Sequence, residues 1–277
     1  MTSATELLQL CQRHLDPNSR PVEKHRGHEN TTVLRATTIH GEVIVKAHRG
    51  RDRHSNELYA YEHWTPTIVD RAPRLLMHIQ DPPAIIITAI PGRPLAELAT
   101  TTASEHAAYQ QAGALLAAWH NAEPATDEID ITGQLADRGE RWLHLAGSLL
   151  SAAERSTIRA HLRALAALTG IPAVPCHLDF TPRNLLYTPG GTVHLIDFEH
   201  SRRDLAARDL VRLADRYWRQ RPDLEAAFLT TYGPLTELDH QVIEHCIHLD
   251  RLTTAVRATG RSLPPTDPRR TNTRRTP

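Results

Sequence analysis

The chain has 277 residues, and its 32 Lys and Arg balance its 32 Asp and Glu, so its formal net charge at pH 7 is zero. That length allows one large domain or two modest lobes, and the balanced charge gives no overall field that would attract nucleic acid or an anionic membrane. No long apolar run or signal-peptide pattern occurs, so we expect a cytoplasmic protein with no membrane partner. The three cysteines are far apart in the sequence, which favours reduced, packed thiols: Cys11, Cys176 and Cys246.

The first third of the chain predicts a small sheet with one helix. Residues 31–47 are rich in β-branched residues on both sides of the turn signal at positions 40 and 41, which predicts a β-hairpin. We expect a helix at about 53–64. Strands should follow at 74–79 and 84–90, separated by a proline-containing turn.

After residue 92 the pattern becomes helical. We expect one helix to open at Thr102, with Glu105 in capping-box spacing, and a second to open at Ser151 with Glu154. These two amphipathic helices should pack together, and residues 204–260 predict further helices.

Two segments look irregular. The acidic stretch 121–140 is expected to be a solvated surface loop, with a site for a polyamine-like substrate as the alternative. The Pro-, Thr- and Arg-rich tail 263–277 is expected to be disordered.

The segment 174–200 carries the strongest signal for chemistry. Asp179 and Asn184 lie five residues apart, and a predicted hairpin then leads into Asp197. Carboxylate and carboxamide oxygens suit Mg²⁺, which completes its coordination with water and substrate phosphates. Phosphoryl transfer is the reaction that this set of residues indicates, because positioning and charge neutralisation dominate its catalysis.

The register of that hairpin can be predicted. If the turn occupies 188–191, Tyr187 lies opposite Thr192, and Asn184 and Asp197 both lie at the open end of the ladder.

The motif His177-x-Asp179-x-x-x-x-Asn184, followed by Ile196-Asp197-Phe198-Glu199, resembles the catalytic and metal-binding loops of aminoglycoside phosphotransferases and related small-molecule kinases. The resemblance implies an α+β, two-lobed protein-kinase-like fold. Its N-terminal antiparallel sheet lobe would span residues 1–90, and its larger helical lobe would span 91–262.

The same resemblance implies roles for single residues. Asp179 would be the catalytic base, Asn184 and Asp197 would hold Mg²⁺, and His177 would brace the loop. Leu178 stands where these antibiotic kinases usually have glycine. Glu199 replaces the glycine of protein kinases, which favours the small-molecule branch.

Upstream positions resemble the nucleotide site of the same enzymes. Lys46 would contact phosphate and pair with Glu57, although Glu62 on the same predicted helix leaves that choice open. Further positions would touch the nucleotide: Asn30 and Thr31 in a covering loop, and Thr88, Ala89 and Ile90 at an interlobe hinge. Asp209 resembles an aspartate that braces the catalytic loop.

The resemblance predicts that ATP or GTP donates a phosphate to a hydroxyl of a small molecule. An antibiotic acceptor, such as an aminoglycoside, nucleoside or peptide, is the first expectation, and it would give resistance by inactivation. A metabolic kinase for choline, homoserine or a sugar-like substrate is one alternative, and a nucleotide-binding pseudokinase without turnover is another.

Histidines near residue 245 suggest zinc at first sight. His240, Glu244, His245 and His248 lie close together in the sequence, but their spacing fits neither HExxH nor HxxEH. A packed or solvated helix is the preferred interpretation.

Overall fold

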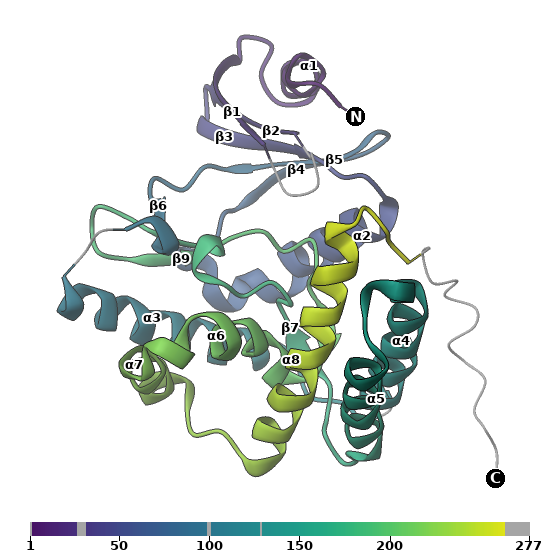
Figure 1. Ribbon diagram of the computed structural model, residues 1–277. Helices are drawn as coiled ribbons and strands as arrows, with labels where there is room; N and C mark the ends of the chain where they lie inside the picture. Colours follow the sequence, from purple (N-terminus) through teal and green to yellow (C-terminus); the bar gives the residue numbers. More distant parts are fainter. Residues whose placement is uncertain (1, 27–31, 99–100, 128, 264–277) are drawn as a thin grey trace.

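The computed structural model describes residues 2–26, 32–98, 101–127 and 129–263, and it has a sheet lobe above a larger helical lobe (Figure 1). The predicted contacts of Asn30 and Thr31 and the predicted disorder of the tail after residue 263 lie outside the described residues. Within those residues, no helix is both long and apolar enough to cross a membrane.

The upper lobe is one antiparallel sheet of five strands in the order β1-β2-β3-β5-β4. Its strands are β1 Arg20–Arg26, β2 Thr32–Thr38, β3 Gly41–Ala47, β4 Leu75–Gln80 and β5 Pro83–Thr88. The predicted hairpin and the two later strands are confirmed. Helix α1 (Ala4–His14), which packs against β2 and β3, and strand β1 were not predicted.

Strand alternation decides which face of the sheet meets the helical lobe. Val43, Val45 and Ala47 of β3 point into a core that they share with α1. The residues between them must point to the opposite face, because successive side chains of a strand alternate. Lys46 is therefore on the face that also carries Ile85 of β5, its partner in the ladder, whose side chain belongs to the core of the helical lobe.

The described residues after β3 contain seven α-helices and several short elements; α2 lies between strands β3 and β4 of the sheet, and the other six helices build the helical lobe. The helices are α2 Arg51–Tyr59, α3 Thr102–His120, α4 Ile131–Ala146, α5 Ala152–Ala167, α6 Val211–Arg216, α7 Pro222–Tyr232 and α8 Glu237–Ala258. The short strands are β6 Arg93–Pro94, β7 Val174–Cys176, β8 Leu185–Tyr187, β9 Val193–Leu195 and β10 Arg202–Asp204. Helix α2 continues as a π-helical turn at Ala60–Trp64 and a 3₁₀ segment at Thr65–Arg71.

Two expectations about these helices were wrong. Helix α3 begins at Thr102, as expected, but its cap is Thr101, whose side chain accepts from the Ser104 N–H, so the capping residue lies one position earlier than the capping-box pattern indicated. Helix α3 packs mainly against α7 rather than α5, which contacts α4 and α8 instead. Amphipathic spacing shows that a helix has a buried face but does not say which partner buries it. The capping box of Ser151 and Glu154 is confirmed.

The hairpin register is also shifted by one residue. Tyr187 lies opposite Val193, not Thr192, because Thr188 pairs with Thr192 and Gly191 adopts a left-handed φ of 78°. A left-handed glycine after the turn adds one residue to the loop, as in a three-residue hairpin loop with a bulge. The open end is preserved, since the Ile196 N–H donates to the Asn184 carbonyl at 3.1 Å.

Candidate active site

Lys46 connects the two lobes through three carboxylates. Its Nζ lies 2.5 Å from Asp197 Oδ1, 2.9 Å from Glu199 Oε2 and 3.0 Å from Glu57 Oε2. Burial alone would lower the pKa of Lys46, but the three carboxylates outweigh it and hold the pKa well above its usual value. The ammonium therefore stays charged, as contact with a phosphate requires.

Glu57, rather than Glu62, meets the lysine. Glu57 is 1% exposed on α2, and its Oε2 also lies 2.5 Å from His48 Nε2. Burial would raise the pKa of Glu57, but Lys46 and His48 outweigh burial and hold that pKa below its usual value. Glu57 is therefore a carboxylate at neutral pH. Glu62 lies in the π-helical turn and is exposed.

Glu199 is a lysine partner that the sequence did not indicate. It is buried, and its second oxygen accepts from Arg53 Nη1 at 2.9 Å. The sequence signal for this role is its place two residues after Asp197. The structure brings Glu199 into the same ion cluster as Lys46 and Asp197.

Asp197 and Asn184 lie together at the open end of the β8–β9 hairpin. Burial would raise the pKa of Asp197, but Lys46 overcomes it and holds the pKa well below its usual range. The Asn184 amide donates from Nδ2 to the Asp179 backbone carbonyl and to Asp179 Oδ2, both at 2.9 Å. Its Oδ1 is thereby left as the acceptor atom, so a carboxylate and a carboxamide oxygen are available as hard ligands.

Asp179 is held by two arginines that the sequence did not indicate. Arg183 Nη2 donates to Oδ2 at 2.7 Å, and Arg212 Nη1 of α6 donates to Oδ1. Burial would raise the pKa of Asp179, but Arg212 and Arg183 reverse that effect and lower it. Arg183 could have been found from its position four residues after Asp179, whereas Arg212 is 33 residues away on another helix.

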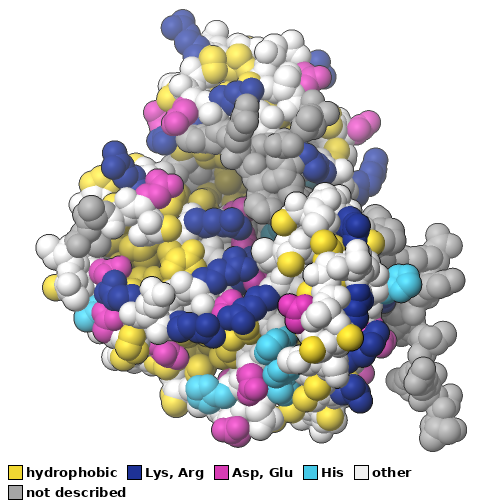
Figure 2. Space-filling model, in the orientation of Figure 1, with side chains coloured by type: hydrophobic (Ala, Val, Ile, Leu, Met, Phe, Trp, Pro, Cys, Tyr) yellow, Lys and Arg dark blue, Asp and Glu magenta, His cyan; other side chains and the backbone are white. Residues whose placement is uncertain are grey.

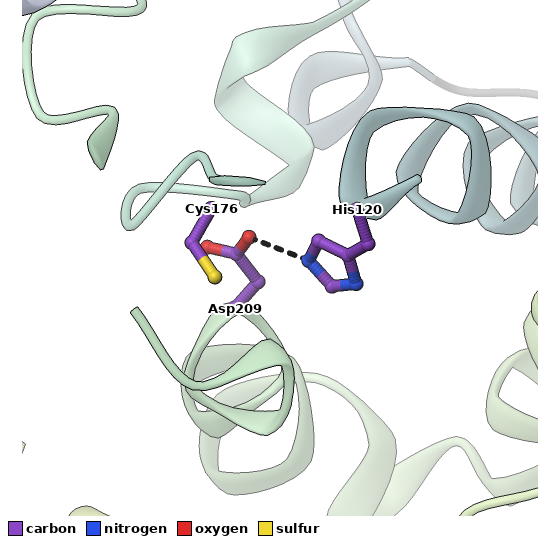
Figure 3. A group of neighbouring side chains, drawn as sticks. All are labelled: His120, Cys176 and Asp209. Carbon is purple, nitrogen blue, oxygen red and sulfur yellow. Dashed lines mark hydrogen bonds and ion pairs between the residues drawn. The ribbon is translucent and has the colours of Figure 1, made fainter. Parts of the chain in front are cut away.

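Asp209 holds the loop that carries Asp179 through hydrogen bonds to its backbone. The backbone N–H groups of His177 and Leu178 donate to Asp209 Oδ2 and Oδ1 at 2.8 and 2.5 Å, and His120 Nε2 lies 3.0 Å from Oδ2 (Figure 3). Cys176 lies beside this group, but both Asp209 oxygens are already used. We interpret the group as a brace rather than as a metal site, as the resemblance implied for Asp209.

His177 joins the two active-site loops. Its Nε2 lies 3.0 Å from the Ile196 carbonyl, and its Nδ1 accepts from the Asp179 N–H at 3.2 Å. Leu178 and Asp197 both have positive φ, 60° and 69°. A residue other than glycine rarely adopts this conformation, and such strain is often found at functional sites.

Two of the three amides of the predicted hinge have hydrogen-bond partners within the sheet lobe. The N–H groups of Thr88 and Ala89 donate to the carbonyls of Arg74 and Glu42 at 3.0 and 2.9 Å, so neither amide faces a ligand. The Ile90 N–H has no hydrogen bond within the described part of the chain. Of the three amides, only that of Ile90 is left to meet a purine.

The acidic stretch is not a free loop. From residue 131 it forms helix α4. Asp130 caps the N-terminus of this helix by accepting a hydrogen bond from the Gly133 N–H at 2.8 Å. Glu123 accepts from Tyr59 and from Arg203, and Glu140 pairs with Arg159. Because these carboxylates already have partners, the structure gives no support to a polyamine site here.

The sequence matches the model of a family described as "Phosphotransferase enzyme family" over residues 22–244, and the chain belongs to that family. No curated protein gives a significant match. Three solved structures illustrate the likeness in fold.

An aminoglycoside-3'-phosphotransferase of type VIII is 21% identical with a TM-score of 0.64, covering 89% of this chain and 97% of its own. A choline/ethanolamine kinase family protein from Mesorhizobium loti is 18% identical with a TM-score of 0.69, covering 93% and 87%. A spectinomycin phosphotransferase, solved with ADP and spectinomycin, is 14% identical with a TM-score of 0.62, covering 92% and 87%. The α+β, two-lobed protein-kinase-like fold is thus confirmed.

Proposed function

We propose that this chain is an ATP- or GTP-dependent O-phosphotransferase that moves a nucleotide γ-phosphate to a hydroxyl of a small molecule. The contact of Lys46 with Asp197 carries the proposal, because it joins a charged lysine of the sheet lobe to a carboxylate beside the Asp179 loop. Such a cluster provides the charge neutralisation and positioning on which phosphoryl transfer depends.

In this mechanism Asp179 is the base. The acceptor oxygen attacks the γ-phosphorus, the bond from that phosphorus to the β–γ bridging oxygen breaks, and the hydroxyl proton passes to Asp179. Lys46 would exchange its contact with Asp197 for the phosphates and keep its pairing with the buried Glu57. Asp179 must exchange at least one guanidinium for the acceptor hydroxyl, because both of its oxygens accept from arginines.

Asn184 and Asp197 are the residues that would hold Mg²⁺. The donor set fits, since Asn184 turns its amide nitrogen to Asp179 and keeps its oxygen for other contacts, and Asp197 is ionised. When bound, the ion neutralises charge on the transferring phosphate.

The nucleotide base would bind at the hinge. We propose that the Ile90 N–H donates a hydrogen bond to the base. The carbonyl of Thr88, two residues earlier, would accept from a purine amino group. Presence of ADP in the solved spectinomycin phosphotransferase supports an adenine nucleotide.

The charged side chains around Asp179 indicate which charge the acceptor molecule should carry. Arg183, Arg212 and Arg216 gather around Asp179 and Asp250, so three guanidinium groups face two carboxylates. Basic side chains are also visible on this part of the helical lobe in Figure 2. Such a surface repels a polycation and favours a neutral or anionic acceptor, such as a nucleoside, over a polycationic aminoglycoside.

We propose that the physiological reaction is phosphorylation of a neutral or anionic antibiotic, which inactivates it in the cytoplasm. The solved relatives named above include both antibiotic phosphotransferases and a choline/ethanolamine kinase family protein, so a metabolic acceptor is the second candidate. We further propose that the lobes divide near residue 90, at the hinge.

The test is nucleotide consumption by the purified protein with Mg²⁺ and a panel of neutral, anionic and polycationic acceptors. Turnover with one acceptor, lost by about 10²-fold or more in Asp179→Asn, supports the mechanism. The matched control is Glu140→Gln, whose carboxylate pairs with Arg159 on the surface. If Mg-nucleotide binds tightly and no acceptor stimulates turnover, the chain is a binding module instead.

A further inference from the structure

Three histidines from two helices meet on the side of the helical lobe away from the nucleotide cleft. His161 comes from α5, and His245 and His248 come from successive turns of α8. Sequence spacing on α8 alone matched no metal motif, and it could not include His161, which lies 84 residues before His245. Histidine side chains are visible over the lower part of α8 in Figure 2.

Their geometry is specific. His161 Nδ1 lies 3.1 Å from His245 Nδ1, and the His161 ring stacks on His248 with centroids 3.7 Å apart and planes inclined by 15°. A carboxylate oxygen of Glu244 lies within 4.8 Å of a ring nitrogen of each of His161 and His245. Two ring nitrogens and one carboxylate oxygen therefore converge on one small volume.

This separation matches that of two ligands of one ion. Nitrogens bound at about 2.0–2.1 Å to a metal lie roughly 2.9 Å apart at a right angle and roughly 3.4 Å apart at the tetrahedral angle. We propose that His161, Glu244 and His245 form a binding site for a divalent transition-metal ion of the zinc type, which bridges α5 and α8.

The donor set defines the class of ion. Imidazole nitrogens favour Zn²⁺, Ni²⁺ or Cu²⁺, whereas Mg²⁺ prefers oxygen ligands and needs near-ideal octahedral geometry. Three protein ligands leave at least one position for water. His248, stacked on His161, holds the plane of that ring and limits its rotation.

A competing explanation is a direct hydrogen bond between the two imidazoles. It requires one Nδ1–H donor and one Nδ1 acceptor, whereas metal binding requires both nitrogens as lone-pair donors. The two explanations differ in whether a transition metal binds at all, and neither depends on the proposed phosphotransferase activity.

The experiment is calorimetric titration of ZnCl₂ into tag-free, EDTA-treated full-length protein in a buffer that contains Mg²⁺. The expected result is one Zn²⁺ per chain. His161→Gln and His245→Gln should each weaken binding by about tenfold or more. His240→Gln is the matched control, because His240 is exposed on the same helix and lies outside the cluster, and it should bind as the unchanged protein does.

Two further readouts use the unchanged protein. Zn²⁺ at about 100 times its Kd should raise Tm by about 5 °C, since the ion binds only the folded arrangement. Co²⁺ should give a visible absorption band that Zn²⁺ abolishes. Absence of Zn²⁺ binding and of a Tm rise overturns the proposal, and so does binding that persists unchanged in both glutamine variants with native circular dichroism.

Discussion

Arg212 of α6 bonds Asp179 and Asp250 at the same time: its Nη1 donates to Asp179 Oδ1, and its Nε donates to Asp250 Oδ1 at 3.0 Å. The guanidinium thereby connects the proposed catalytic base to α8, the last helix. One arginine thus sets both the position of this carboxylate and its affinity for a proton.

Replacing Arg212 should therefore change the pH dependence of the reaction. Because Arg212 contributes to lowering the pKa of Asp179, Arg212→Met should raise that pKa. A base acts only when it is deprotonated, so the acid limb of the profile of kcat/KM against pH should move to higher pH. Steady-state rates measured from pH 4 to pH 9 at saturating Mg²⁺ test this, and the unchanged protein should keep its rate to lower pH than the variant does.

Arg216→Met is the control for that change. Arg216 contacts Asp250 and Thr254 but, within the described residues, does not contact Asp179, so the acid limb should stay in place. Equal shifts in both variants would mean that the general field of the helical lobe, rather than the contact of Arg212 with Asp179, sets the profile.

Loss of Lys46 should reduce both turnover and stability. Lys46→Met removes the cation shared by Asp197, Glu199 and Glu57, so kcat/KM should fall on the order of 10²-fold or more. The uncompensated buried carboxylates should cost about 3 kcal/mol of unfolding free energy.

The stability part of that expectation has its own check. Adding Glu57→Gln to Lys46→Met should recover part of the lost stability, because one buried negative charge is removed, but should restore no activity. Urea unfolding of both variants measures this. A double variant less stable than the single one would contradict the electrostatic explanation.

Asp209 should be needed for the fold of the Asp179 loop. Asp209→Ala leaves the N–H groups of His177 and Leu178 buried without an acceptor, which should cost about 3 kcal/mol and lower Tm by about 8 °C. Asp223→Ala, which removes an exposed carboxylate paired with Arg221, should cost under about 1 kcal/mol. Calorimetry of both variants makes the comparison.

Acid should destabilise the protein in two ranges. Burial lowers the pKa of His54, and that of His200 to about 4, both from 6.5, so the unfolded chain binds protons first and stability falls as pH drops below about 6.5. Asp197 and Glu57 have lowered pKa values, so their stabilising effect is present above about pH 4.5 and is lost as pH falls further. Thermal unfolding across pH 3–8 should show a Tm that declines in both ranges.

Local sequence was enough to predict much of this fold. The hairpin of β2 and β3, the strands β4 and β5 and the capping box of Ser151 depend on residues close together in the chain, and all are present. The motif spacing likewise pointed to Asp179, Asn184 and Asp197, whose roles stay predictions.

What the sequence could not predict depends on tertiary packing. Gly191 shifted the β8–β9 register because its left-handed conformation is chosen by the whole loop, and α3 found α7 because several helices offered apolar faces. Arg212 reaches Asp179 only when α6 docks beside the loop. None of these pairings has a fixed spacing in the sequence.

The brace at Asp209 also has a consequence for motion. It ties the loop of Asp179 to α3 through His120, entirely within the helical lobe, whereas Lys46 reaches Asp197 and Glu199 from the sheet lobe. If the lobes swing apart to exchange nucleotide, the lysine contacts break and the base keeps its place. Each catalytic cycle then rebuilds the phosphate clamp while the acceptor side remains assembled, so acceptor binding need not wait for lobe closure.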